Sequence, residues 1–500
     1  MLKKLHSGAS VDSIFLAFIQ IITFLCSMVI TKILSVNLTK FEYGTYSAVM
    51  IVVNTTCSLI LLGLPDSINY FYNINTKDSS LDERKTYVNT IFGISLVVGI
   101  SVAFLLSLLN KQISSYFDNS SVGELIIIVS ILPCFENGVR LYQTLFVTTG
   151  KARVIAIKNL VISLVRIAIV AVAIVLLKDL RMVFILTVVS TILQYVILGL
   201  VFRKAKFQVN PFKFDVSKVM PIFKYSIPMA VYAITNTLMR EVDKLVIGRV
   251  ASTESLALYT NCAKILPLNI ITTSFATVLI PYITESIANH DYEKCKKIFK
   301  HYLEIGYLTI WMFSTAIMVS SKEVLPFLYS DAYSEGLPIF IIYMIDGMVQ
   351  FASMHLIIAA SGNSLYIMKS SLFCLISNVI LDIGLYYLFS MIGLPLLGPA
   401  IATCIVTVLY SVIIMRKSMK IVDARIIEIL DVKRVAVYLA ELFVIAGIVY
   451  FLRLFLLGSN VPRYVCMMIC CVMCCFIIVL LNYKSLKTLL KQINSFKLEE

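Results

Sequence analysis

Residues 154–177 read VIAIKNLVISLVRIAIVAVAIVLL, a run whose apolar length decides the fold. A helix that crosses a lipid bilayer needs about 20 predominantly apolar residues. Fourteen such runs can be counted along the 500 residues, near 12–36, 45–72, 87–109, 123–148, 154–177, 181–202, 222–248, 256–287, 301–320, 337–360, 366–390, 393–415, 435–457 and 461–482. The sequence therefore predicts an all-α polytopic membrane protein with about 14 transmembrane helices.

The overall composition agrees with this reading. Hydrophobic residues make up 59% of the chain and charged residues 14%, and the mean hydropathy is +0.91. Soluble domains carry about 25% charged residues and must cover their surface with polar groups. A soluble enzyme, a secreted protein and a disordered scaffold are therefore excluded. The connections between the runs are too short to contain a soluble catalytic domain.

The net charge of +14 also has a membrane explanation. Of the 43 basic residues, 29 lie at the termini, in every second connection or in the run ends beside those connections, whereas nine, Arg453 among them, lie in or beside the connections on the opposite side. The positive-inside rule then places both termini in the cytoplasm, and we expect a multi-pass protein of the bacterial cytoplasmic (inner) membrane. We expect no nucleic-acid partner, and no disulfides, because nearly all of the twelve cysteines lie within apolar runs.

Two six-span segments share landmarks. Gly63-Leu-Pro65 in the first corresponds to Ile280-Pro281 in the second, and Thr149-Gly150-Lys151-Ala152 corresponds to Ser361-Gly362-Asn363-Ser364, at displacements of about 212 to 216 residues. We predict an N-lobe at 1–210, a C-lobe at 211–420, and two additional helices with a basic cytoplasmic tail at 421–500. Two six-span repeats insert with the same orientation, so the substrate site is expected between the lobes.

Charged side chains inside the runs indicate function, because each costs roughly 2.5–3.5 kcal/mol at the bilayer centre. The basic candidates are Arg140, Arg166, Arg240, Lys244 and Lys264. One interpretation is internal pairing, of Arg140 with Glu136 four residues earlier and of Arg240 with Asp243.

The other interpretation is a hydrated cavity for an anionic ligand. Like charges at i, i+4 repel unless an anion lies between them, and arginine binds phosphates through two donors. The predicted substrate-binding residues are Arg140, Arg166, Asn236, Arg240, Lys244 and Lys264.

Carboxylates in the runs could carry a coupling proton or sodium ion, and the candidates are Glu136, Asp346 and Asp382. The sequence contains no phosphate-binding loop, since Gly150-Lys151 lacks the preceding glycine and is followed by alanine. The four histidines are scattered. We therefore expect neither a catalytic site nor a cofactor nor a metal site.

Several motifs resemble a known family. They are Lys224-Tyr-Ser-Ile-Pro228, Asp243-Lys-Leu-Val-Ile-Gly248, Leu258-Tyr-Thr-Asn-Cys-Ala-Lys264, Leu62-Gly-Leu-Pro65 with Tyr70 and Tyr72, and Gly393 with Gly398, Ala400 and Ala402. Their order and spacing are similar to those of bacterial polysaccharide (O-antigen or capsule repeat-unit) flippases of the multidrug/oligosaccharidyl-lipid/polysaccharide (MOP) transporter superfamily. The likeness covers nearly all of residues 10–482. The family usually has arginine where this chain has Lys244.

The resemblance implies a two-lobed, V-shaped bundle that works by alternating access. It implies translocation of an undecaprenyl-pyrophosphate-linked oligosaccharide repeat unit across the cytoplasmic membrane, in the biosynthesis of lipopolysaccharide or capsule. The partners so implied are the lipid-linked oligosaccharide, membrane lipids, and polysaccharide polymerase or chain-length machinery.

Three alternatives remain open at this stage. A multidrug antiporter of the same superfamily would need only twelve spans, whereas a lipid II-type flippase, like a repeat-unit flippase, would suit fourteen. A membrane polysaccharide polymerase or ligase would be expected to carry a large outward loop with catalytic arginine or histidine, and no such loop is present.

Overall fold

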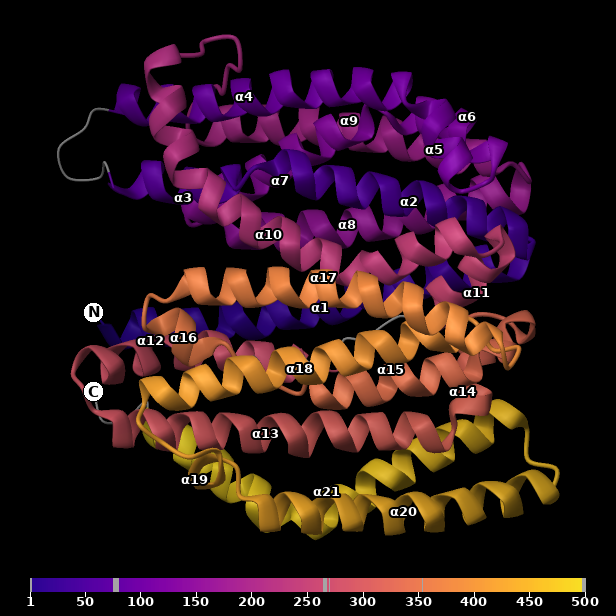
Figure 1. Ribbon diagram of the computed structural model, residues 1–500. Coiled ribbons are helices and arrows are strands. Elements are labelled where there is room, and N and C mark those ends of the chain that lie inside the picture. Colours follow the sequence, from indigo (N-terminus) through magenta and orange to yellow (C-terminus); the bar gives the residue numbers. More distant parts are fainter. Residues whose placement is uncertain (1, 75–80, 264–267, 269, 353, 497–500) are drawn as a thin grey trace. The chain divides into compact units, whose positions relative to one another are not determined.

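The computed structural model describes residues 2–74, 81–263, 268, 270–352 and 354–496, and every regular element among them is a helix (Figure 1). The all-α prediction is confirmed. The chain forms two compact units, Met1–Ala257 and Leu258–Glu500. The predicted lobes at 1–210 and 211–420, with the segment 421–500, stay a prediction.

The helices, in chain order, are α1 (Leu2–Asn37), α2 (Lys40–Leu61), α3 (Leu64–Ile74), α4 (Leu81–Leu108), α5 (Asn110–Tyr116), α6 (Ser120–Val129), α7 (Leu132–Thr148), α8 (Ala152–Val170), the π-helix η1 (Ala171–Leu176), α9 (Leu180–Ala205), α10 (Val216–Val250), α11 (Thr253–Cys262), α12 (Ile270–Ala288), α13 (Tyr292–Val319), α14 (Ser321–Leu328), the 3₁₀-helix η2 (Asp331–Gly336), α15 (Leu337–Val349), α16 (Leu356–Ala360), α17 (Ser364–Ser390), α18 (Leu397–Ile421), α19 (Ile426–Ile429), α20 (Val432–Gly458) and α21 (Arg463–Phe496).

The helical residues described in each of the fourteen predicted runs belong to one helix or to two consecutive helices. Among the described residues, eleven helices are long and apolar enough to cross a membrane, or twelve if α6 and α7, which meet at a 45° bend, form one span. The two remaining predicted runs lie on α10 and on α11 with α12. The seventh run contains four charged residues between 240 and 244, which makes it less apolar than the others.

Helix α7 is central to the first unit and packs against α2, α3, α4, α8 and α9. One side of α7 carries Leu141, Tyr142 and Leu145, all at most 4% exposed, in the core shared with α3, α4 and α9. The polar residues Glu136 and Arg140 are four residues apart and therefore share a different side of the helix.

The predicted repeat is visible in the backbone at one pair of landmarks. Gly150 and Gly362 both adopt positive φ, at 78° and 75°. Around Gly150 the amides of residues 149, 150, 151 and 154 donate to the carbonyls of 145, 147, 146 and 151. Around Gly362 the same four hydrogen bonds recur exactly 212 residues later. The turns α7–α8 and α16–α17 therefore have one geometry.

Gly63 ends α2 and allows a close helix contact. Its φ is +64°, a conformation that glycine adopts without steric cost. A Cβ atom placed on Gly63 would lie 2.4 Å from the carbonyl oxygen of Ser226 on α10. The Gly63-Leu-Pro65 motif thus lets α10 pack against the junction of α2 and α3.

We predict that Gly63→Ala destabilises the protein by about 1–3 kcal/mol, because the new methyl group combines an unfavourable φ with a steric clash. Thermal unfolding in detergent, followed by size-exclusion chromatography, would measure the loss. Gly384→Ala on α17 is the matched control, since a Cβ there has no neighbour within 4 Å. Equal midpoints for the two variants would contradict the prediction.

In the second unit, α20 runs parallel to α13 and α14 in a fixed register (Figure 1). Arg434 pairs with Glu304, the Tyr438 hydroxyl donates to the Leu308 carbonyl at 2.8 Å, and Arg453 pairs with Glu323; each partner lies 130 residues earlier in the chain. The two ion pairs are 19 residues apart on α20. At 1.5 Å per residue this is about 28 Å, close to the thickness of the hydrocarbon core.

The pair of Arg453 and Glu323 is buried and bidentate. The Arg453 Nε atom lies 2.9 Å from Glu323 Oε2, a second contact joins Nη2 to Oε1, and the side chains are 6% and 5% exposed. The sequence pattern grouped Arg453 with the outward connections and gave no role to Glu323. In the structure Arg453 lies inside α20, because its buried partner compensates its charge.

We predict that Arg453→Leu lowers the free energy of unfolding by about 3–5 kcal/mol, because Glu323 is left as an uncompensated buried charge. The double variant Glu323→Leu/Arg453→Leu should recover much of this loss in thermal unfolding. Arg463→Leu removes a pair with Asp331 whose side chains are 42% and 72% exposed, and it should cost less than about 1 kcal/mol. A double variant as unstable as the single one would contradict the pairing argument.

Candidate functional site

The predicted site residues lie on five helices. Glu136 and Arg140 lie on α7, Arg166 on α8, Asn236, Arg240 and Lys244 on α10, Asp346 on α15 and Asp382 on α17. Lys264 lies outside the described residues. All of the described substrate-binding candidates therefore belong to the first unit.

One carboxylate joins two of the predicted cations. Glu136 Oε1 lies 4.0 Å from Arg140 Nη2, and Glu136 Oε2 lies 4.0 Å from Arg166 Nη2 on the neighbouring helix. Charge-assisted hydrogen bonds between nitrogen and oxygen are usually about 2.7–2.9 Å long. Glu136 therefore lies between the two guanidinium groups and offsets only part of their charge, without holding either by a hydrogen bond. We call Glu136, Arg140 and Arg166, with Lys158 described below, the Glu136 cluster.

Lys158 belongs to this cluster and was missed by the sequence reasoning. It lies on α8, two turns before Arg166, and interacts electrostatically with Glu136 and Arg166. Its position inside the run 154–177 was the available signal, since lysine is as costly there as arginine. The cluster thus contains three cations and one carboxylate.

The cluster is partly accessible. The side chains of Glu136, Arg140 and Arg166 are 27%, 39% and 49% exposed. Arg166 lies well inside the candidate span Ala152–Leu176, with ten residues, or about 15 Å, between it and the nearer end. An exposed guanidinium at that depth faces water or polar groups, because contact with lipid would be too costly.

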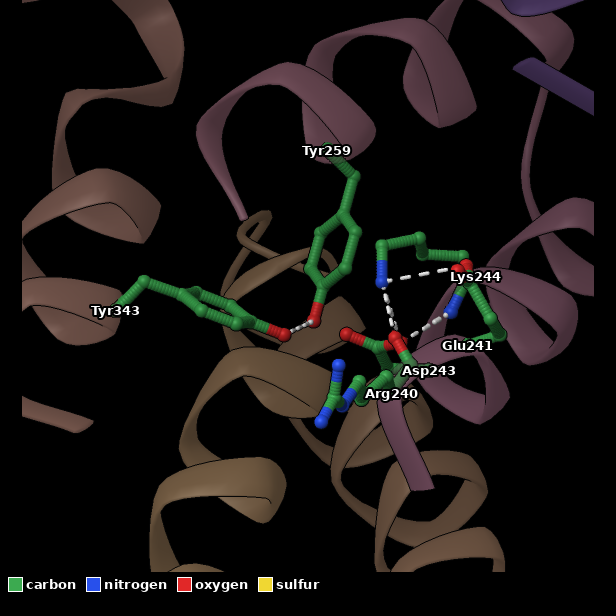
Figure 2. A network of polar contacts seen from close by, with 6 residues as sticks. All are labelled: Arg240, Glu241, Asp243, Lys244, Tyr259 and Tyr343. Atoms are coloured by element: carbon green, nitrogen blue, oxygen red, sulfur yellow. Dashed lines mark hydrogen bonds and ion pairs between the residues drawn. The ribbon is translucent and has the colours of Figure 1, made fainter. Parts of the chain in front are cut away.

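A second charged group lies on α10 (Figure 2). Lys244 Nζ lies 3.6 Å from Glu241 Oε2 and 3.5 Å from Asp243 Oδ1, and it also contacts the Arg240 carbonyl. The Lys244 side chain is 12% exposed. Asp243 therefore pairs with Lys244, and the pairing of Arg240 with Asp243 is not formed.

Arg240 is the accessible cation of the charged group at residues 240–244. Its side chain is exposed, and its guanidinium makes no ion pair with any described residue. Asn236, one turn earlier, is partly buried. Arg240 can therefore bind an incoming anion without first losing a carboxylate partner, whereas Lys244 already has two.

The two coupling candidates of the second unit are both buried. Asp346 is 1% exposed and accepts a hydrogen bond of 2.8 Å from the Gln350 side chain. Asp382 is fully buried, one turn after the buried Asn378, on the helix that packs against α18. Glu136 lies in the first unit, so the three candidates do not form one group within either unit.

A buried tyrosine pair in the second unit was not anticipated. The hydroxyl oxygens of Tyr259 on α11 and Tyr343 on α15 lie 3.0 Å apart, and the two rings meet edge to face (Figure 2). Both side chains are at most 3% exposed. This hydrogen bond ties α11 to α15, and only the fold brings the two residues together.

The part of the chain that the structure describes contains no candidate metal site. No three His, Cys, Asp or Glu side chains there are grouped to hold a metal ion. None of the twelve cysteines, all of them described, forms a disulfide. The structure thus offers ion pairs and polar side chains for binding.

Solved structures with a similar fold are transporters. The inward-closed lipid II flippase MurJ matches with a TM-score of 0.72 and 14% identity, over 95% of this chain and 99% of that one. An inward-facing multidrug resistance MATE transporter of the MOP superfamily matches with a TM-score of 0.67 and 12% identity, over 80% and 94%. A MOP superfamily transporter from Pyrococcus furiosus, described as having a binding pocket of reverse polarity, matches with a TM-score of 0.58 and 14% identity, over 82% and 94%.

These likenesses establish the fold. Among curated protein sequences, none matches the chain. A protein-family profile described as polysaccharide biosynthesis protein matches residues 17–338, which is more than half of the 500 residues. The resemblance inferred from the motifs is confirmed, and the chain belongs to this polysaccharide biosynthesis protein family, with the fold of the MOP superfamily.

Proposed function

We propose that the protein is a flippase that moves an undecaprenyl-pyrophosphate-linked oligosaccharide repeat unit across the cytoplasmic membrane by alternating access. Membership of a polysaccharide biosynthesis family supports a role in making a surface polymer. The shared fold with the lipid II flippase MurJ and with MATE transporters supports transport rather than catalysis.

The observation that carries the proposal is the Glu136 cluster. Three cations share one carboxylate inside predicted spans, and the contacts of Glu136 with Arg140 and Arg166 are each 4.0 Å long. A pyrophosphate brings more negative charge than Glu136 and can accept two hydrogen bonds from each arginine. The cations of the cluster can therefore release the Glu136 carboxylate and bind an anionic headgroup in its place.

The physical chemistry of the substrate fits a membrane protein of this kind. A sugar headgroup with charged phosphates cannot cross hydrocarbon unaided, because its polar groups would lose their hydrogen bonds. The polyprenyl tail is apolar and can remain in lipid. A hydrated cationic passage is needed only for the headgroup, and Arg166 and Arg240 have the exposure that this requires.

A lipid II-type flippase is the second candidate, and a multidrug antiporter is the third. The likeness to the lipid II flippase extends over 95% of this chain, compared with 80% for the MATE transporter. This difference favours a lipid-linked substrate over a drug. A repeat unit is preferred to lipid II because the matching family is one of polysaccharide biosynthesis.

Three further parts of the proposal rest on the sequence. Both termini are placed in the cytoplasm by the distribution of basic residues. A proton or a sodium ion would couple transport through Glu136, Asp346 or Asp382. Polysaccharide polymerase or chain-length machinery would receive the translocated unit.

We predict that Arg140→Ala, Arg166→Ala and Arg240→Ala each reduce surface polysaccharide at least tenfold at unchanged protein level, because each removes a cation that contacts the headgroup. Immunoblots of polymer and of membrane protein would measure both quantities. Arg181→Ala is the control, since Arg181 forms an exposed pair with Glu124 at the start of α9. Wild-type polymer from Arg140→Ala and Arg240→Ala would refute the proposed binding site.

We predict opposite effects of Glu136→Gln and Lys158→Gln on binding of undecaprenyl pyrophosphate to the purified protein. Loss of the competing carboxylate should tighten binding several-fold, whereas loss of the lysine should weaken it several-fold. Native mass spectrometry in detergent would measure both affinities. Unchanged affinity in both variants would mean that the Glu136 cluster stabilises the fold and does not bind the headgroup.

A further inference from the structure

The connection between α9 and α10 carries exposed apolar side chains outside the predicted spans. Phe212 is 86% exposed, Val216 is 73% exposed and Met220 is 74% exposed. Val216 and Met220 are four residues apart on the first turns of α10, so they lie on the same side of that helix. We call residues 203–220 the α9–α10 linker.

The linker is fixed on α4 by buried polar groups. The Asn210 amide donates to Asn89 Oδ1 at 2.8 Å, and the Asp215 amide donates to Thr90 Oγ1 at 3.1 Å. Asn89 and Thr90 are 3% and 0% exposed. The apolar side chains are therefore exposed on a segment that buried hydrogen bonds hold in place.

Close packing strengthens this attachment. A Cβ atom on Gly93 of α4 would lie 2.7 Å from the Pro211 carbonyl oxygen and 3.1 Å from the Phe214 ring. Phe214 thus packs against α4, whereas Phe212, two residues earlier, is almost fully exposed. The α9–α10 linker presents one aromatic side chain to α4 and the other away from it.

Asp215 fixes the start of α10. Its carboxylate accepts hydrogen bonds from the Ser217 amide at 2.9 Å and from the Ser217 hydroxyl at 2.7 Å. These hydrogen bonds lower the pKa of the Asp215 carboxyl below its ordinary value. The cap therefore stays ionised where an anionic surface lowers the local pH.

The depth of the attachment can be read from α4. Thr90 lies 18 residues before Leu108, the last residue of that helix, which is about 27 Å along the axis. The hydrocarbon core is about 30 Å thick. With Leu108 at the far boundary of the hydrocarbon, the α9–α10 linker contacts α4 near the opposite membrane boundary. The length of α10 agrees, since its 35 residues span about 52 Å and must extend beyond the hydrocarbon.

The charge of the linker is strongly positive. It contains five cations and one carboxylate: Arg203, Lys204, Lys206, Lys213, Lys218 and Asp215. Lys218 is partly engaged, 3.7 Å from Glu83 and over the Tyr87 ring, but Lys206 and Lys213 are exposed. Apolar side chains beside exposed lysines at a membrane boundary are typical of segments that bind anionic lipid.

We propose that the α9–α10 linker is an interfacial anchor, which inserts Phe212, Val216 and Met220 among the lipid headgroups and binds anionic lipids through Lys206 and Lys213. The occupant is a bilayer surface, because the apolar residues lie at its level and the lysines carry the complementary charge. The anchor fixes the start of α10 and is independent of the substrate that the protein carries.

A tryptophan reporter tests the insertion. The chain has one tryptophan, Trp311, so Trp311→Phe/Phe212→Trp places the only indole on the linker. In nanodiscs with brominated lipids, its fluorescence should be quenched more by bromines near the headgroup than by bromines near the chain end. Phe443→Trp, at an 83% exposed position within α20, should show the opposite order. If Trp311→Phe is unstable, Phe212→Trp is compared with wild type.

Charge substitutions test the lipid class. Brominated phosphatidylglycerol should quench Phe212→Trp more than brominated phosphatidylcholine at equal mole fraction. Lys206→Gln/Lys213→Gln should reduce this preference about fivefold per lysine. Lys111→Gln/Lys178→Gln removes two exposed lysines from other connections and should leave it unchanged. Absence of quenching, as expected if a protein or a second copy covers the segment, or equal quenching by both lipids, would overturn the proposal.

Discussion

The cost of placing a charge in hydrocarbon constrains every polar feature of this protein. An unpaired guanidinium or carboxylate at mid-bilayer is costly, so each must find a counter-ion, a hydrogen bond or water. The second unit meets this constraint by burial and tight pairing, as Arg453 and Glu323 show. Around Glu136 the first unit meets it differently, with contacts of 4.0 Å and with exposed guanidinium groups. This contrast separates charges that stabilise the fold from charges that are available to a ligand.

The packing of α7 and α10 suits these helices to the proposed binding site. Both helices pack firmly within the first unit, α7 through Leu141 and Leu145 and α10 through its contact with Gly63. Rigid packing on one side holds the polar residues of the other side in place. Arg140 and Arg240 are therefore presented from fixed positions, which lowers the entropic cost of ordering them around a ligand.

Much of the fold could be predicted from the sequence, because apolar length determines which segments cross a membrane. The fourteen runs all correspond to helices, and the 212-residue repeat recurs in the hydrogen bonds around Gly150 and Gly362.

Partners that are distant in the chain could not be predicted. The pairing of Glu136 with Arg140 follows from helical spacing, whereas the approach of Arg166 requires the packing of α7 on α8. Helical spacing also gave one wrong prediction, because it paired Asp243 with Arg240, whereas in the structure Asp243 pairs with Lys244. Lys158 could have been selected from the sequence alone, because it lies inside the predicted run 154–177 as Arg166 does.

The register between α13 and α20 has a consequence for how the chain is made. The ribosome adds the arginine partners of Glu304 and Glu323 130 residues after each glutamate. At a translation rate of about 5–20 residues per second, each carboxylate waits roughly 6–26 seconds for its counter-ion. During that time the two carboxylates must remain hydrated or be sheltered by the insertion machinery. The protein therefore reaches its final arrangement in the bilayer only after α20 has emerged from the ribosome, so a truncated chain that ends before Arg434 presents two glutamates without their arginines to quality control.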